Sequence, residues 1–471
     1  MSLPQPEASV ISPVPRAAAA SLKRAARTRL FLEGPVGSTL ARLAAPNVIA
    51  MSVQSAMSVS EAYFAGRMSV TALAGLALVF PLVMLTQMLS AGAMGGAISS
   101  AVARALGAGN TERAGGLVVA AWLLALAIAM LSALLMALFG REIFALLGGE
   151  GGAVQAAMTY AAVYFPGCVS LWVCHSTLSV IRGTGNMATP GLVLVLVSMG
   201  AIPLSGALGL GWGPFPALGL PGLALGMVLA YGIGALAALC YVLTGQAGLS
   251  LRDRPARLDP GLFADILKVG LSASFNSVLT ALTIVMMVGI VGRFGEAALA
   301  GYGLGARLEF LMIPVVFGIG SAMTSMVGAN IGAGQRDRAL RIAWTGSLSA
   351  ATIIGGIGIV LAFMPDLWLR IFLDPEQADA LGIGRAYMRT VAPFYFFFGL
   401  GLALYFACQG AGRMRWPVIG SICRLGFAIG GALILISQTD LGVRGVFIAI
   451  AAAMLVYGTV TGIAVRLTRW R

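Results

Sequence analysis

Uninterrupted apolar stretches of about 20 residues or more recur along the whole chain, and they constrain its fold more than any other feature. Each stretch is long enough to cross a bilayer as a helix. Backbone groups in lipid must be satisfied within the segment, so helices are the expected structure. Charged residues make up 10% of the 471 positions, against about 25% in a soluble domain. The sequence therefore predicts an all-α polytopic membrane protein.

Twelve transmembrane helices are predicted, near residues 40–64, 71–102, 115–139, 153–181, 189–211, 218–245, 262–291, 297–327, 340–363, 379–408, 416–437 and 443–466. Most of the 30 basic residues fall in the two tails and in the even-numbered connections. By the positive-inside rule, this distribution predicts that both termini are cytoplasmic. The net charge of +13 thus follows from topology and attraction to anionic lipid, and no nucleic-acid partner is expected.

Three sequence blocks recur in the same order, about 226 residues apart, at 66–75 and 292–301, at 106–114 and 331–339, and at 183–190 and 410–417. This duplication predicts two pseudo-symmetric lobes of six helices each. The expected organisation is a basic cytoplasmic tail at 1–37, an N-lobe at 38–247, a cytoplasmic linker at 248–260 and a C-lobe at 261–471. An even number of spans per lobe makes the repeats parallel, a transporter architecture whose substrate site lies between the halves.

The chain resembles the multidrug and toxic compound extrusion (MATE) transporters over residues 40–466. The resemblance rests on the paired Gly-Arg…Ala-Leu-Ala-Gly blocks, on Ala105-Leu-Gly-Ala-Gly-Asn110, on Arg182-Gly-Thr-Gly-Asn186 and on Gly301-Tyr-Gly-Leu-Gly-Ala-Arg-Leu-Glu309. It implies a MATE-like fold of twelve helices in the inner membrane of a bacterium. It also implies a monomeric antiporter that expels cationic or amphipathic small molecules against a proton or sodium gradient.

In that family, an acidic residue near the outer part of the first span handles the coupling ion, and Glu61 occupies this place. Other acidic positions of the family are missing. The seventh-span glutamate of the NorM-type branch aligns with Thr280, and the polar pair of the archaeal-type proton network aligns with Ala201 and Ser205. The resemblance is therefore closest to the DinF-type branch, and this reduced site favours protons over sodium as the coupling ion.

Helical spacing places Asn47, Gln54, Ser58 and Glu61 on one face of the first span. The polar stripe is about 21 Å long at 1.5 Å per residue. Facing lipid, the acid alone would cost about 2.5–3.5 kcal/mol on insertion scales, so the stripe is predicted to face protein or a wet cavity. The alternative is that Glu61, near the end of the span, extends outward to the membrane interface.

The matching face of the seventh span carries no acid. Asn276, Thr280 and Thr283 form a mildly polar stripe there, and Met287 adds a side chain that adapts to varied ligands. We predict that these residues line the substrate cavity together with the stripe of the first span. Methionine is also common core filler, and this alternative stays open for Met287.

Four further polar residues lie in predicted spans. His175 is the single histidine and is either a proton relay or a hydrogen-bonded structural residue. Arg307 and Glu309 stand two residues apart, so they point to nearly opposite faces of the eighth span. Glu309 is predicted to pair with Arg424 of the eleventh span or with Arg307 across the packing, as a brace of the C-lobe or as a gate.

Several function classes lack their residue patterns. The five cysteines form no metal-ligand spacing, the glycine-rich blocks lack the Gly-Lys-Ser/Thr ending of a phosphate loop, and no catalytic motif of a membrane-embedded enzyme occurs. We therefore expect no metal, no cofactor and no enzyme activity. A lipid or lipid-linked oligosaccharide flippase of the same wider superfamily is the alternative to multidrug antiport.

The predicted topology can be tested with a reporter that is active only outside the cytoplasm. We expect it to stay silent when fused after Arg471, because the positive-inside rule keeps that end inside. Inserted near Gly148, in an odd-numbered connection, the reporter should be active. The opposite pattern would overturn the twelve-span arrangement with both termini inside.

Overall fold

The computed structural model describes residues 16–249, 259–468 and 470, and helices dominate this part of the chain. Eleven helical segments are long and apolar enough to cross a membrane. The twelfth long helix is α2 (Val36–Met68), which is more polar because it carries the predicted stripe. These segments confirm the predicted all-α fold. Most of the predicted linker at 248–260 lies outside the described residues, as does the first part of the tail at 1–37.

The helices follow the chain in two sets of six spans, and two of the spans are each built from three segments. The bounds are α1 (Arg16–Glu33), α2 (Val36–Met68), α3 (Val70–Gln87), η1 (Met88–Met94), α4 (Gly95–Gly107), α5 (Thr111–Leu146), α6 (Gly151–Gly183), α7 (Ala188–Leu210), α8 (Leu220–Leu243), α9 (Pro260–Gly292), α10 (Glu296–Gly332), α11 (Arg336–Phe363), α12 (Asp366–Leu369), α13 (Ala378–Val391), η2 (Ala392–Phe394), α14 (Tyr395–Ala411), α15 (Arg415–Gln438) and α16 (Val443–Thr468).

The duplicated Gly-Ala-Gly blocks turn out to be the turns that connect helices. Gly109 and Gly334 adopt φ values of 73° and 77°, which glycine reaches without the steric cost that other residues have. Asn110 then caps α5, because its side chain accepts a hydrogen bond from the backbone N–H of Arg113 at 2.8 Å. The sequence repeat therefore encodes the same helix–turn–helix join in both halves.

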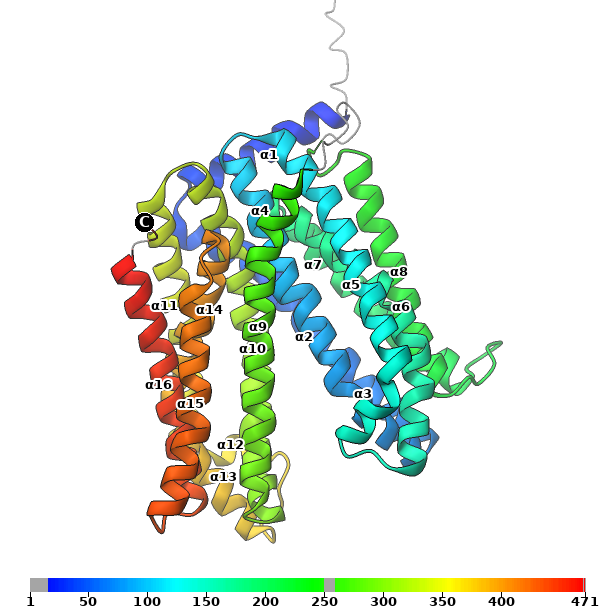
Figure 1. Ribbon diagram of the computed structural model, residues 1–471, viewed down its shortest axis with the longest axis vertical. Coiled ribbons are helices and arrows are strands. Elements are labelled where there is room, and N and C mark those ends of the chain that lie inside the picture. Colours follow the sequence, from blue (N-terminus) through cyan, green and yellow to red (C-terminus); the bar gives the residue numbers. More distant parts are fainter. Residues whose placement is uncertain (1–15, 250–258, 469, 471) are drawn as a thin grey trace, which may run out of the picture.

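Two lobes lie side by side, with α2–α8 in one and α9–α16 in the other (Figure 1). They meet at the end of the molecule where α1 lies, and their helices diverge toward the opposite end. The contact is made mainly by α10, which packs against α2 and α4 of the other lobe, while α14 also packs on α4. The interface is therefore concentrated at one end of the bundle.

Glycine allows the backbones of α4 and α10 to touch. A Cβ added to Gly107 would lie 2.0 Å from the carbonyl oxygen of Ala329, and one added to Gly332 would lie 2.0 Å from that of Arg104. These two contacts are equivalent under the repeat, because Gly107 and Gly332 are repeat counterparts, and so are Arg104 and Ala329. Closer to the N-terminal end of α4, the hydroxyl of Ser99 is 2.9 Å from that of Ser325 in α10.

Polar contacts across the lobes reinforce this closure. Arg104 forms an ion pair with Asp265 of α9 at 2.8 Å, and Arg113 approaches the same carboxylate at 3.3 Å. Gln409 of α14 donates to the carbonyl oxygens of Gly92 and Ala93 at 3.1 and 2.9 Å. Those two carbonyls belong to η1, a π-helical segment, and π-helical turns often occur at functional sites.

Helix α1 joins both lobes at the closed end. The backbone oxygen of Phe31 accepts hydrogen bonds from Asn330 at 3.0 Å and from Arg338 at 3.3 Å, both in the C-lobe. The Phe31 ring lies 3.2 Å from the Cβ position of Gly185, which is in the N-lobe. This helix therefore bridges the lobes on the side where they already touch.

Substituting the contact glycines should separate the lobes. We expect Gly107→Ala and Gly332→Ala each to destabilise the protein by about 1–3 kcal/mol, because the new methyl group meets backbone that cannot move aside. A fall in Tm of the purified protein would measure this. Gly303→Ala in α10 is the control, since nothing lies within 4 Å of its Cβ position. Equal Tm values for the three variants would contradict the close contact.

Candidate functional site

The polar stripe of α2 runs from the lobe interface into the N-lobe. Asn47, Gln54 and Glu61 are 1%, 9% and 7% exposed, while Ser58 is half-buried. Asn47 donates to Ser321 of α10 at 3.0 Å. Gln54 donates to the hydroxyl of Tyr231 in α8 at 2.8 Å and to Gln87 of α3 at 3.2 Å. The stripe therefore packs against protein along most of its length.

Glu61 is a buried carboxyl group without a positive partner. Tyr160 of α6 donates a hydrogen bond to its Oε1 at 3.3 Å, and the described residues form no ion pair with it. Burying an ionised carboxylate without a counter-charge costs several kcal/mol. The group must therefore take up a proton or a cation from outside the chain to be buried in this way at low cost.

His175 lies in the same lobe and reaches the stripe through Tyr231. Its ring is fully buried, and its Nδ1 is 2.8 Å from the hydroxyl of Ser90. The ring stands edge-on to that of Tyr231, with centroids 5.5 Å apart, and Tyr231 accepts the hydrogen bond of Gln54. His175 Nε2 has no partner among the described residues. Both interpretations, structural histidine and relay, remain predictions.

The predicted C-lobe residues do not join the stripe of α2. Asn276 accepts a hydrogen bond from Ser421 of α15, inside the packing of the C-lobe. Thr280 and Thr283 donate to carbonyls of their own helix at 3.0 and 2.7 Å. Met287 is 2% exposed. In this conformation Thr280 is half-buried and the other three side chains are buried in the C-lobe, so their role in a shared substrate cavity stays a prediction.

The charged residues predicted to brace or gate the C-lobe, Arg307, Glu309 and Arg424, form no ion pair with one another in the described part of the chain. Arg307 is exposed and Glu309 half-buried, as their two-residue spacing on α10 requires, so Arg307 does not provide a buried partner. Glu309 accepts a hydrogen bond from Tyr387. The Arg424 guanidinium lies over the rings of Phe398 and Tyr457, 5.8 and 5.3 Å from their centroids. The side chains of Glu309 and Arg424, both among the described residues, form no ion pair, so their pairing stays a prediction.

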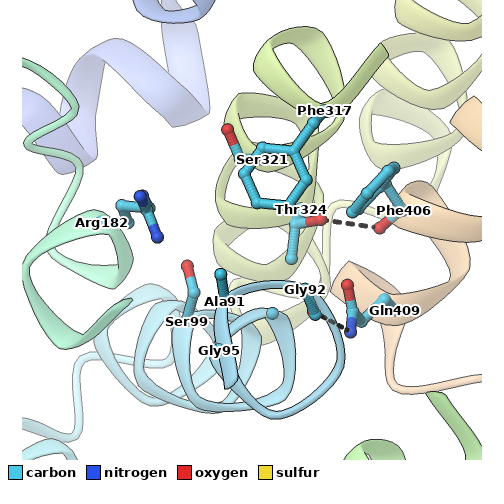
Figure 2. Close-up of a pocket in the computed structure, with 11 residues that line it drawn as sticks. Ala91, Gly92, Gly95, Ser99, Arg182, Phe317, Ser321, Thr324, Phe406 and Gln409 are labelled. Carbon is cyan, nitrogen blue, oxygen red and sulfur yellow. Dashed lines mark hydrogen bonds between the residues drawn. The ribbon is translucent and has the colours of Figure 1, made fainter. Parts of the chain in front are cut away.

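Sequence reasoning missed Arg182, which is only 2% exposed. In the sequence it belongs to the Arg-Gly-Thr-Gly block after the fourth span, and a basic residue at the end of a span usually indicates only the membrane topology. The structure places it in the last turn of α6, beside a cavity between the lobes (Figure 2). A signal was present in the chain, because Arg182 follows His175 by seven residues and therefore shares its helix face.

Metal and cofactor chemistry finds little support in the side chains. Across residues 16–249 and 259–468, no group of three or more histidine, cysteine or acidic side chains could hold a metal ion. The five cysteines are free, and three of them are buried. The site is thus built from single polar groups placed on different helices.

The sequence profile of the MatE family matches two stretches of the chain, residues 46–205 and 273–434. The chain belongs to the MatE family. One stretch falls in each half, as the predicted repeat requires. This MatE protein is therefore a membrane transporter and not an enzyme.

Similar proteins cover nearly the whole MatE chain. The probable multidrug resistance protein YoeA of Bacillus subtilis is 26% identical over 402 residues, which are 83% of this chain and 86% of YoeA. The FAD transporter of Shewanella oneidensis is 24% identical over 435 residues, 91% and 94% of the two chains.

Among solved structures, the outward-facing conformation of a multidrug resistance MATE family transporter superposes with a TM-score of 0.83 at 25% identity, covering 93% of this chain and 97% of its own. These likenesses confirm the twelve-helix MATE fold and support multidrug efflux as the transport class. The DinF-type branch stays a prediction.

The hydrogen bond between Tyr160 and Glu61 can be tested by its removal. We expect Tyr160→Phe to shift the pH profile of transport, because the phenol stabilises one protonation state of the carboxyl group over the other. Tyr63→Phe serves as the control, since Tyr63 is on the same helix as Glu61 but is 61% exposed. Identical pH profiles for the wild type and Tyr160→Phe would show that Tyr160 does not influence Glu61.

Proposed function

We propose that this MatE protein is a secondary active multidrug efflux antiporter that exports cationic or amphipathic compounds in exchange for protons. The observation that carries the proposal is the buried Glu61 carboxyl group, which has a tyrosine as its hydrogen-bond partner and no ion pair with any basic residue among those described. Such a group needs either a proton or a cation from outside the chain. A single site that is neutralised by either a proton or a cation is the minimum requirement for exchanging one for the other.

Competition at Glu61 would couple the two fluxes. If a proton and a cationic substrate neutralise the same charge, each weakens the binding of the other, and linkage makes this effect reciprocal. Proton entry from the side where protons are concentrated then promotes substrate release. The antiport direction follows from this coupling and from alternating exposure of the site to the two sides.

Protons fit the surroundings of Glu61 better than sodium. A sodium site gathers several oxygen ligands around the ion, as sites for other hard cations do. In the described part of the chain, Tyr160 is the single hydrogen-bonding partner of Glu61. At the positions where the archaeal-type network has polar side chains, Ala201 offers none and Ser205 donates to the carbonyl oxygen of Leu223 at 3.0 Å. Sodium remains the alternative coupling ion.

The lobes are closed at the end that carries α1. With both termini in the cytoplasm, as the charge distribution predicts, this conformation would be outward-facing, like the similar solved structure described in that way. We place the protein in the bacterial inner membrane as a monomer, with lobe boundaries at 38–247 and 261–471. Opening at the α1 end and closing at the other would complete the transport cycle.

Two other substrate classes are alternatives to cationic or amphipathic drugs. A lipid or lipid-linked oligosaccharide flippase is less favoured, since the two relatives described above are named as a probable multidrug resistance protein and as an FAD transporter. The relative named FAD transporter makes that anionic compound a useful probe. The negative Glu61 favours a cationic dye over FAD as the exported molecule.

Replacing Glu61 tests the proposal directly. We expect Glu61→Gln to fold and insert normally, because a neutral side chain in the membrane costs less than a charged one. Proton-driven export of a cationic dye from vesicles should be lost, since the amide cannot exchange a proton. Glu61→Asp should keep part of the activity, with a shifted pH optimum.

The matched control is Glu142→Gln, which changes an exposed glutamate on α5 and should transport at the wild-type rate. Protein levels must be equal in all vesicles. Wild-type export by Glu61→Gln would remove the proposed mechanism. Transport driven by a sodium gradient at fixed pH, without a proton gradient, would replace protons with sodium.

A further inference from the structure

The cavity between the lobes has walls from both halves of the protein. Arg182 of α6 lies on one side, with Ser99 of α4 beside it, while Thr324 of α10 and Gln409 of α14 lie opposite (Figure 2). Since these helices belong to different lobes, the cavity exists in this form only while the lobes are closed at this end.

Arg182 presents unused hydrogen-bond donors at this cavity. Its Nε and Nη2 are buried and have no hydrogen-bond partner among the described residues. These two nitrogens form the side-on edge of the guanidinium, the geometry that holds an anion with two N–H groups. None of the ion pairs in the described part of the chain involves Arg182.

Burying the Arg182 guanidinium without a partner of opposite charge is energetically costly. An unpaired ion in the protein interior has a penalty of several kcal/mol, and arginine does not lose its proton to avoid it. The chain supplies aromatic rings to its other buried arginine, Arg424, but the structure records no such ring contact for Arg182. Among the described residues the guanidinium therefore lacks a counter-charge, which a bound anion would supply.

We propose that Arg182 binds a small halide-sized anion, such as chloride, in the cavity between the lobes. Ser179 lies one helical turn before Arg182, and its hydroxyl also has no partner among the residues described. That hydroxyl is 2.7 Å from the Cβ position of Gly95, and Gly95 lines the cavity. On this face of α6, two N–H donors and one O–H donor are thus left without a partner and could serve an anion.

The size of the cavity selects the ligand. The centre of a water-sized particle has ≈ 10 Å³ in which to move, close to the minimum that accommodates one water molecule. Among anions, a halide requires the least enlargement of this space, whereas phosphate or the acidic group of a large solute would require the lobes to separate. Gln409 Oε1 also lies here without a partner, and because it repels an anion, it favours a position close to Arg182.

Anion binding would stabilise the closed arrangement of the lobes. A ligand that binds one conformation shifts the equilibrium toward it by mass action. Because the C-lobe wall of the cavity, which includes Thr324 and Gln409, covers Arg182 only when this end is closed, the anion should leave when it opens. The inference does not depend on the coupling role of Glu61, and its test requires no transport.

The experiment measures Tm of the purified full-length protein while sodium gluconate is replaced by sodium chloride or sodium bromide at constant ionic strength. We expect a saturable rise of about 1–3 °C for the wild type and loss of this rise in Arg182→Gln. Arg424→Gln is the control: it should lower Tm but keep the halide response. Equal Tm in gluconate and chloride for the wild type, or a full halide response in Arg182→Gln, would overturn the proposal.

A second measurement applies even if Arg182→Gln does not fold. In crystals of the wild type grown with bromide, we expect an anomalous peak within hydrogen-bonding distance of Arg182 Nε and Nη2. Inorganic phosphate is the size control in the thermal assay. Stabilisation by phosphate but not by halide would reject the halide site in favour of a phosphate-bearing ligand, and the absence of a bromide peak would also reject it.

Discussion

Backbone contact between α4 and α10 is the constraint on which the rest of the structure depends. Gly107 and Gly332 bring the two helices so close that a side chain at either position would collide with a carbonyl group. This approach sets the distance between Ser99 and Ser325 and encloses the cavity beside Arg182. Because the two glycines are repeat counterparts, one duplicated element supplies both sides of the junction.

The two lobes treat buried charge differently. In each lobe a glutamate accepts a hydrogen bond from a tyrosine, Glu61 from Tyr160 and Glu309 from Tyr387. The difference lies in the arginines, because Arg424 of the C-lobe lies over two aromatic rings. In the N-lobe, Glu61 and Arg182 have no partner of opposite charge among the described residues. Ligands of opposite sign, one cationic and one anionic, would satisfy them. This difference between the lobes supports the proposal that ions bind in the N-lobe.

Much of this arrangement was predictable from the sequence. Hydropathy located the spans within a few residues, because a bilayer imposes length and apolarity directly. The internal repeat gave the two lobes, and helical spacing placed Asn47, Gln54 and Glu61 on one buried face. These features depend on single helices or on chain symmetry, and both can be read from the order of residues.

What the sequence did not reveal depends on how different helices meet. Spacing predicts which residues share a face, but not which neighbour that face contacts, so the partner of Asn276 in α15 was missed. A basic residue at a span end normally marks topology, and only the packing of α6 against η1 and α4 shows that Arg182 is buried. The π-helical segment η1 contains no proline from which it could have been predicted.

The position of α1 has a consequence for how the protein is made. Phe31 is synthesised early, yet its carbonyl oxygen is bonded to Asn330, 299 residues later in the chain. Helix α1 therefore cannot dock until the C-lobe spans up to α10 have been inserted and have packed on the N-lobe. Until then, its basic residues can rest on the anionic membrane surface. Docking of α1 is therefore a late step in biogenesis that follows the association of the two lobes.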